Sequence, residues 1–318
     1  MSWSKRRASL FAVMLAIVAT ITSCGGGTDG TGIQEAYVEG VMTKGSVIVN
    51  GIHFDDSTAQ VEIDSLSATP ADLASGMFVR LRGRINQDGI SGVAEMVQVI
   101  NEVRGSINAV NPAAGTLTVV GQSVLVSPTT IYADVAGIAA LEIGQRVEVF
   151  GLRDADGTIR ASRIELLEEE SDDDLRGLVS NLTASTFTLN GVIVNYASAA
   201  VRPAGAVIAT GQLVEVDGSF DEATGVFTAS EVVLGESSGD QVLPGTGDQL
   251  ELEGYVANLD KALGAFILNS RPVRYSASTT FEGGSAANLA NNVEVEARGV
   301  VDTEGVLRAS RIEIKQGD

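Results

Sequence analysis

The feature that most constrains the fold of this chain is a set of four short motifs that recurs four times in the same order. The first motif is an apolar residue, a charged residue and a glycine, found at 38–40, 103–105, 175–177 and 252–254. Recurrence of this kind is the sequence signature of tandem structural units. The pattern therefore predicts four related modules, where length alone suggests two or three domains.

The second motif is a run of alternating apolar residues that leads into a tight turn, at 46–51, 116–121, 186–191 and 265–270. Copies one and three carry Asn-Gly at the turn, copy two carries Val-Gly and copy four Asn-Ser. Asn-Gly between two apolar strands favours a type I′ turn, because both central residues of that turn need a positive φ. We therefore expect a β-hairpin here in each module.

The third motif is a Gly-x-x-Val-x-Val-x-Gly segment at 144–151 and 211–218. Copy one is looser, at 76–83, and copy four has Asn292 in place of the first glycine and ends at Gly299. Strict alternation of apolar and polar residues predicts a strand with one buried face and one face in water.

The fourth motif is a turn ending in glycine followed by another alternating strand. It is clearest at 156–165 and 304–313, recurs at 224–232 and is degenerate at 88–97. Copies two and three keep all their glycines, whereas copies one and four have diverged at separate motifs. Divergence in the terminal copies fits capping repeats at the two ends of a row of modules.

The fold class predicted from these motifs is all-β. Between the second and third motifs lie Ala-rich stretches without alternation, at 70–73, 135–141 and 285–289, which we read as a short helix or helical turn. The order strand, strand, strand, short helix, strand, strand is that of a five-stranded OB-like barrel, which closes a small sheet and removes most of its exposed edges. An open β-sandwich or another small barrel is the alternative.

The strand Gly-Gln-x-Val-Glu-Val-x-Gly and the hairpin Asp-Gly-x-Ile-x-Ala-x-x-Ile-Glu give the chain a resemblance to a known group. It resembles bacterial exported lipoproteins that carry tandem copies of a domain of unknown function. The resemblance covers nearly the whole chain after its leader, and it implies small β-barrel modules in the cell envelope but no activity and no site residues. The predicted organisation is a leader (1–23), a flexible tether (24–34), module 1 (35–101), module 2 (102–167), an acidic linker (168–173), module 3 (174–236), a second linker (237–249) and module 4 (250–318).

The first 23 residues have the pattern of a targeting segment. Positive charges at 5–7 precede an apolar run at 10–21, which is shorter than the roughly 20 residues that span a bilayer. Ile21-Thr22-Ser23-Cys24 then resembles the bacterial lipobox, which implies lipid attachment to the Cys24 thiol and cleavage before it. Several acyl chains on one residue anchor a protein stably, where one chain is marginal.

Charge and cysteine content exclude several functions. The formal net charge is -20, and removal of the leader takes away positive charges only. A body this acidic is repelled by the phosphates of nucleic acids. Because Cys24 is the only cysteine and is the predicted lipidation site, we expect no disulfide, no thiolate metal site and no cysteine nucleophile.

Three features could bind metal or act in catalysis, and each has a simpler interpretation. The acidic run at 168–174 lacks the preformed cage of six to eight oxygens that calcium needs, so we read it as a solvated spacer. The turn at 154–157 resembles the start of a calcium loop, but its glycine comes too early and a hairpin tip explains it better. His53, the only histidine, is read as a strand-surface residue.

The arginines that flank the repeated Ala-Ser pair, Arg160, Arg163, Arg308 and Arg311, are expected to pair with carboxylates on neighbouring strands, such as Glu148 or Glu165. Nucleic-acid binding, which an OB-like order suggests by analogy, needs a basic groove with aromatic platforms that this sequence lacks.

We therefore expect a non-enzymatic, lipid-anchored envelope protein without a cofactor, a structural spacer or scaffold or a weak binding array for protein or polysaccharide. No metal-ligating or catalytic residue is predicted, and Cys24 is the one predicted modification site. The alternative is a divalent-cation-dependent binding module that uses clustered carboxylates.

Overall fold

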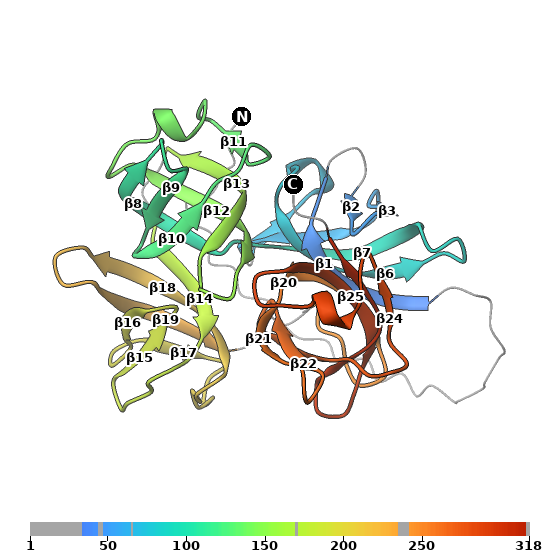
Figure 1. Ribbon diagram of the computed structural model, residues 1–318. Coiled ribbons are helices and arrows are strands. Elements are labelled where there is room, and N and C mark those ends of the chain that lie inside the picture. Colours follow the sequence, from blue (N-terminus) through green and yellow to red (C-terminus); the bar gives the residue numbers. More distant parts are fainter. Residues whose placement is uncertain (1–33, 44–46, 65, 169–170, 235–241, 316–318) are drawn as a thin grey trace, which may run out of the picture.

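The computed structural model describes residues 34–43, 47–64, 66–168, 171–234 and 242–315. In these residues the protein is all-β, with three short 3-10 helices (Figure 1). The predicted leader and tether, with Cys24, lie outside the described residues except for Gln34, a predicted tether residue that is instead the first residue of a strand.

Each module contributes one set of strands. Module 1 contains β1 (Gln34–Val41), β2 (Val47–Val49), β3 (Ile52–Asp55), β4 (Gln60–Ile63), β5 (Leu66–Ala68), η2 (Pro70–Asp72), β6 (Phe78–Ile85) and β7 (Ser91–Ile100). Module 2 contains β8 (Val103–Asn111), β9 (Thr116–Val119), β10 (Gln122–Leu125), β11 (Ile131–Ala133), η3 (Ile138–Ala140), β12 (Arg146–Arg153) and β13 (Ile159–Leu167). Module 3 contains β14 (Asp173–Leu178), β15 (Thr186–Leu189), β16 (Val192–Asn195), β17 (Ala200–Arg202), β18 (Leu213–Asp221) and β19 (Val226–Leu234). Module 4 contains β20 (Gln249–Tyr255), β21 (Ala257–Asp260), β22 (Ala265–Leu268), β23 (Arg271–Arg274), β24 (Thr280–Glu282), η4 (Ala286–Asn288), β25 (Glu294–Val301) and β26 (Leu307–Ile314).

The two hairpins and the parallel pairing of the last strand recur in every module, and module 2 shows the fullest set of pairs. Its first strand, β8, pairs antiparallel with β9 and with β12. β9 and β10 form the predicted hairpin, and β12 and β13 form the second hairpin. The last strand, β13, also pairs in parallel with β10 and with β11.

The predicted hairpin turns have the backbone that their sequences require. φ is 50° at Asn50 and 75° at Gly51, and 46° at Asn190 and 91° at Gly191. Val120 in module 2 also adopts a positive φ, although a β-branched residue disfavours it. The hairpin prediction is confirmed in all four modules.

The predicted helical stretches are single 3-10 turns, η2, η3 and η4, in modules 1, 2 and 4. A short strand that the sequence did not predict precedes each of them. This strand, β11 in module 2 and β24 in module 4, pairs in parallel with the last strand of its own module. Its three residues are too few to show a periodic pattern.

The closing glycine of the third motif is required by close contact between backbones. The register of the second hairpin shifts just before Gly83, Gly151, Gly218 and Gly299, which marks a β-bulge in each module. A Cβ atom at Gly299 would lie 2.0 Å from the carbonyl oxygen of Arg308, and at Gly151 2.2 Å from that of Arg160. The bulge therefore excludes any side chain at this position.

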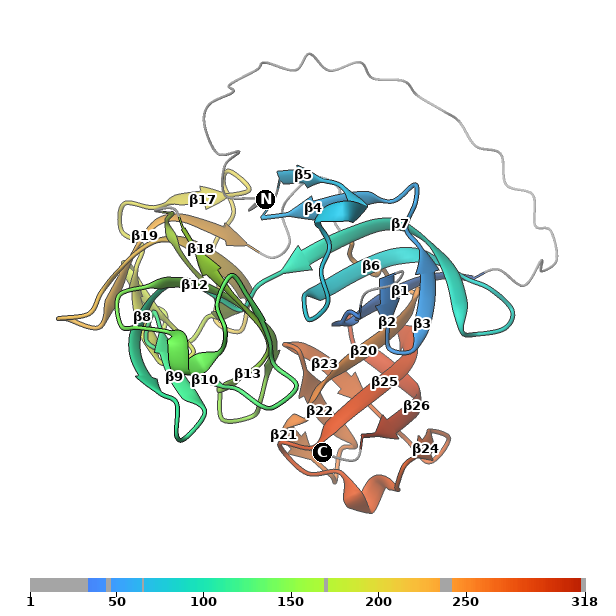
Figure 2. The ribbon, with the colours of Figure 1, turned by 90° about the horizontal axis from the view of Figure 1, so that it is seen from above.

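The four modules are not separate closed barrels, so that part of the sequence prediction is corrected. The strands form two continuous sheets, one of 14 strands from modules 1 and 4 and one of 12 strands from modules 2 and 3. β1 pairs in parallel with β20, and β8 pairs antiparallel with β14. Figure 2 shows the stacked repeats as two adjoining pairs.

Free strand edges explain this arrangement. Among the described residues, β1 pairs inside its own module only with β6, which leaves its other edge open for β20. An exposed edge with unpaired N–H and C=O groups is a template for another strand. The terminal modules 1 and 4 thus cover each other, and the expected row of modules with capped ends is not formed.

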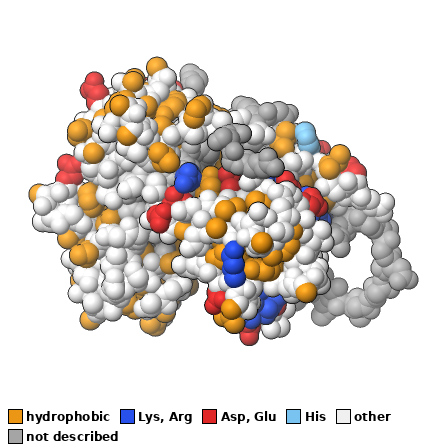
Figure 3. Space-filling model, in the orientation of Figure 1, with side chains coloured by type: hydrophobic (Ala, Val, Ile, Leu, Met, Phe, Trp, Pro, Cys, Tyr) orange, Lys and Arg blue, Asp and Glu red, His pale blue; other side chains and the backbone are white. Residues whose placement is uncertain are grey.

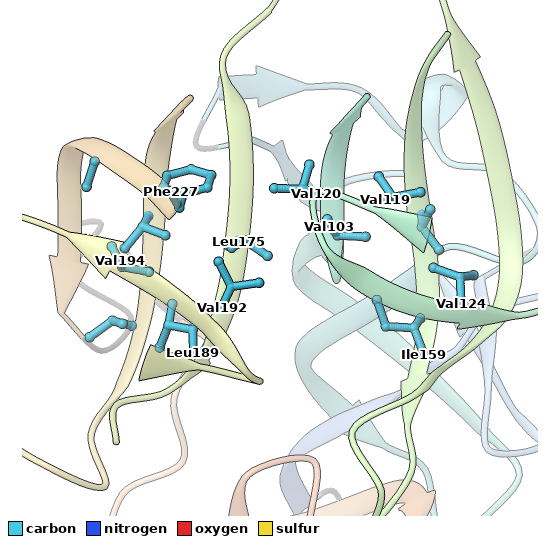
Figure 4. Close-up of a cluster of buried hydrophobic side chains, with 14 of the residues drawn as sticks. Val103, Val119, Val120, Val124, Ile159, Leu175, Leu189, Val192, Val194 and Phe227 are labelled. Atoms are coloured by element: carbon cyan, nitrogen blue, oxygen red, sulfur yellow. The ribbon is translucent and has the colours of Figure 1, made fainter. Parts of the chain in front are cut away.

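The cores follow the pairs of modules only in part. Modules 2 and 3 share one apolar cluster, in which Val120 and Val192 from the two modules lie between Val103 and Leu189 (Figure 4). Module 1 has its own cluster, joined by Phe150 of module 2. Module 4 has a third, which Tyr37 and Met96 of module 1 join.

Replacement of Gly299 by alanine tests the bulge. We expect Gly299→Ala to lower the free energy of unfolding by about 1–3 kcal/mol, because the new methyl group overlaps backbone that cannot move freely. Gly245→Ala, in the linker that precedes this module, is the control, since Gly245 is exposed and its nearest atom, a carboxylate oxygen of Asp248, is 3.5 Å from an added Cβ. Urea denaturation measures both, and equal stability of the two variants would contradict the account.

Candidate functional site at the junction of the four modules

The charged residue of the first motif faces a module boundary in every repeat. The residues are Glu39, Arg104, Arg176 and Glu253. Each lies on the first strand of its module, the strand through which the modules pair. In the sequence these residues mark the repeat, and no sequence pattern identifies them as functional.

The glycine after each charged residue makes room for the turn of the hairpin. A Cβ at Gly177 would lie 2.6 Å from the amide of Asn190, whose side-chain N–H₂ donates to the carbonyl oxygen of Arg176 at 2.8 Å. The amide of Asn269 donates in the same way to the carbonyl oxygen of Glu253. In these modules the asparagine of the second motif therefore fixes the strand that carries the first motif, which explains why the two motifs occur together.

Glu39 joins modules 1 and 4 through a buried ion pair. Its side chain is 1% exposed. Arg271 of module 4 donates to Glu39 Oε1 from Nε at 2.9 Å and from Nη2 at 2.6 Å, and Arg80 Nε lies 3.3 Å from the same oxygen. Burial opposes ionisation of Glu39, but Arg271 and Arg80 outweigh it and lower its pKa to about 2.

A cavity of about 230 Å³ lies beside this pair, and polar and apolar residues from all four modules line it. The lining includes Glu39 and Arg80 of module 1, Arg153 of module 2, Arg176 of module 3 and Tyr255 of module 4. Both basic and acidic side chains line the cavity, so it has no single charge sign. On the face shown in Figure 3, charged side chains of both signs also gather where modules 2 and 3 adjoin modules 1 and 4.

Arg104 is the second buried ionic centre and is surrounded by carboxylates from three modules. Its guanidinium lies 2.6 Å from Asp64 of module 1, 3.7 Å from Glu148 of module 2 and 3.8 Å from Asp217 of module 3. Arg104 is 5% exposed, and these carboxylates together with Asp174 raise its pKa in spite of burial. The arginine remains charged and ties three modules together.

Several buried carboxylates near the junction are held partly protonated. Burial, followed by the charge of Glu296, raises the pKa of Glu251 to about 8. Burial also raises the pKa of Glu253 to about 7, although its Oε2 accepts the backbone N–H of Val41 across the boundary at 3.1 Å. Burial, with the charge of Glu215, raises the pKa of Asp217 to about 6.

The acidic run at 168–174 does not behave as a solvated spacer throughout. Its last two residues form the start of β14 and are buried. Asp173 pairs with Arg146 at 2.9 Å and accepts the backbone N–H of Phe220, which joins modules 2 and 3. Asp174 lies beside Arg104 in the sheet register. No sequence pattern predicts this burial, because a run of acidic residues looks the same whether it lies in an exposed linker or at the start of a buried strand.

Asp154 lies at a hairpin tip and His53 on a strand surface, as the simpler interpretations of these residues predicted. Asp154 Oδ1 accepts the N–H groups of Asp156 and Thr158, as a hairpin tip requires. His53 is exposed on β3. Neither is part of a carboxylate, histidine or cysteine cluster with metal-binding geometry among the described residues.

The repeated arginines pair with carboxylates as expected, though not always with those predicted. Arg163 lies 2.5 Å from Glu165, which is on the same strand, β13, and not on a neighbouring one. Glu148 is 3.7 Å from Arg104. The other three arginines pair as follows: Arg160 with Asp154, Arg308 with Asp302, and Arg311 with Glu282 and Glu313.

The fold and the junction define a class, an all-β protein of tandem repeats whose modules share sheets and buried ion pairs. The family model described as "Domain of unknown function (DUF5666)" matches residues 35–98, 104–165, 176–233 and 253–313, and the chain belongs to this family. A comparison with curated proteins finds no match. None of the described helices is long and apolar enough to cross a membrane.

The buried carboxylates predict an unusual dependence of stability on pH. Glu251, Glu253 and Asp217 have folded pKa values above their ordinary ones, so their stabilising effect is complete below about pH 4 and is lost as pH rises toward 8. Glu39 has a lowered pKa, so its effect is present above about pH 4.5 and is lost as pH falls toward 2. We expect Tm to be highest near pH 5 and several degrees lower at pH 8.

Calorimetry between pH 3 and pH 9 measures this profile, and Glu251→Gln is the matched variant. An amide at this position stays neutral, so the decline in Tm between pH 5 and pH 8 should become shallower. A Tm that rises steadily from pH 5 to pH 8 in the wild type would contradict the account.

Proposed function

We propose that this protein is a non-enzymatic, lipid-anchored protein of the bacterial cell envelope that acts as a structural scaffold. The lipobox at 21–24 supports the anchor, since Cys24 is the only cysteine of the chain and follows a short apolar run. The anchor would hold the acidic β body at the periplasmic or outer surface of a membrane, the outer membrane being the expected one.

One observation supports the scaffold role: charged residues of the first motif contact residues of other modules. Glu39 binds Arg271 of module 4, Glu253 accepts the N–H of Val41 of module 1, and Arg104 contacts carboxylates of modules 1 and 3. Side chains that could bind a substrate are thus used to fix one module against another. A body fixed in this way holds its surfaces at constant spacing, which suits a spacer or a binding array for envelope protein or polysaccharide.

We also propose that each module is an OB-like unit whose first strand is shared with a neighbour. The pairing order in module 2 supports this, since it runs from β8 through β9, β10, β13 and β12 and returns to β8. The resemblance to OB-fold proteins does not extend to nucleic-acid binding, because the chain has 41 acidic and 21 basic residues.

A second candidate function is divalent-cation-dependent binding. The favouring observation is a cluster of three carboxylates, Asp174, Glu215 and Asp217, on β14 and β18. Of these three residues, only Asp174 belongs to the acidic run at 168–174.

Substitution of the lipidation site tests the anchor. We expect Cys24→Ala to shift the protein from the membrane fraction to the soluble periplasmic fraction, or to block cleavage of the leader, because the acyl chains need the thiol. Ser23→Ala, which keeps a small residue before the cysteine, should be processed and anchored as the wild type is. Cell fractionation and mass spectrometry of the mature N-terminus measure both variants.

Two results would contradict the proposal. Membrane partitioning of Cys24→Ala equal to that of the wild type would remove the lipid anchor. Turnover of an envelope substrate by the purified mature protein, abolished by a single substitution at the junction, would replace the scaffold by an enzyme.

A further inference from the structure

A group of acidic side chains lies between modules 2 and 3, where β14 and β18 run antiparallel. In the register of these strands Asp174 is opposite Asp217, and Arg104 of β8 is opposite Asp174 on the other side. Glu215 and Asp217 are two residues apart on β18, so their side chains leave the same face of the sheet. This register brings three carboxylates together.

The distances between the carboxylates suit a cation. One oxygen from each of Asp174, Glu215 and Asp217 lies within 4.8 Å of the other two. Calcium binds oxygen at about 2.3–2.6 Å, so two of its ligands can be up to about 5 Å apart.

A second observation points to a ligand, because one buried oxygen of this group has no partner. Asp174 is 1% exposed, and its Oδ1 accepts no hydrogen bond within the described part of the chain. A buried polar atom without a partner costs free energy comparable with a lost hydrogen bond, and an ionised one costs more. The nearest guanidinium, Arg104, directs its Nη1 to Asp64 at 2.6 Å.

The local charge balance also favours a cation. Arg104 faces four carboxylates: Asp64, Glu148, Asp174 and Asp217. The arginine of β14, Arg176, is opposite Glu215 in register and acts on Glu39 at the junction. The pocket around Asp174 therefore carries an excess of negative charge even with both arginines counted.

We propose that Asp174, Glu215 and Asp217 bind one calcium ion between β14 and β18. Water completes the coordination, because three carboxylates supply fewer than the six to eight oxygens that calcium takes. The ligands are all oxygens, which suits hard cations and not zinc or copper. The bound ion offsets the charge repulsion on β14 and so strengthens the shared sheet of modules 2 and 3.

The rival occupant is a proton. Burial and the charge of Glu215 raise the pKa of Asp174 well above its ordinary value and that of Asp217 to about 6. Protons and the ion therefore compete for the same oxygens. This inference does not rest on the scaffold role or the lipid anchor, so its failure would leave both intact.

Calorimetric titration of the whole mature chain with calcium chloride at pH 7.5 tests the site. We expect a single saturable site with a Kd of about 0.1–1 mM, the range of extracellular calcium modules. Tm should rise with calcium and saturate. Asp174→Asn should weaken this binding at least about tenfold, because it removes one of the three carboxylate ligands.

The control is Asp134→Asn, which removes the same charge from an exposed position of module 2. It should bind calcium as the wild type does. If Asp174→Asn does not fold, Glu215→Gln takes its place. The absence of a Tm shift at about 10 mM calcium, or an equal shift in Asp174→Asn and the wild type, would overturn the proposal, the second result showing diffuse binding to an acidic surface.

Discussion

The arrangement of this protein depends on one interaction, the buried pairing between Glu39 of module 1 and Arg271 of module 4. A buried ion pair contributes little net stability compared with apolar residues, but removal of one partner is costly, by about 3–5 kcal/mol. Its main effect is therefore specificity. Arg80 belongs to the same module as Glu39, but Arg271 reaches Glu39 only when β1 lies beside β20, so the Glu39–Arg271 pair selects this contact among the strand edges that four similar modules offer.

The signs of the charges support this view. The first motif carries Glu, Arg, Arg and Glu in modules 1 to 4. The Glu modules pair with each other through β1 and β20, and the Arg modules through β8 and β14. Each pair of modules then needs side chains of the opposite charge. Arg80 and Arg271 supply it for the two Glu modules, and Asp174 and Asp217 supply it for the two Arg modules. Identical modules would lack such a distinction.

Much of each module could be predicted from its sequence, because the signals are local. Asn190-Gly191 identifies a turn, and alternation identifies the strands around it. The contacts between modules could not be predicted, since the pairing of β1 with β20 joins residues more than 200 positions apart and depends on a register that no local pattern records. Asp174 illustrates the same limit for the candidate site, since only the neighbouring strands distinguish it from the exposed Asp172.

The pairing of the two terminal modules is the central claim, and a cysteine pair tests it most directly. With Cys24→Ala the mature chain has no thiol, so Ala36→Cys and Gln249→Cys add the only two. These residues are direct partners in the β1–β20 register, and paired strands bring Cα atoms within the range that a disulfide spans. The account predicts an intramolecular disulfide after mild oxidation of the folded protein, with both single variants remaining reduced monomers. Two free thiols in the oxidised, folded double variant would contradict it.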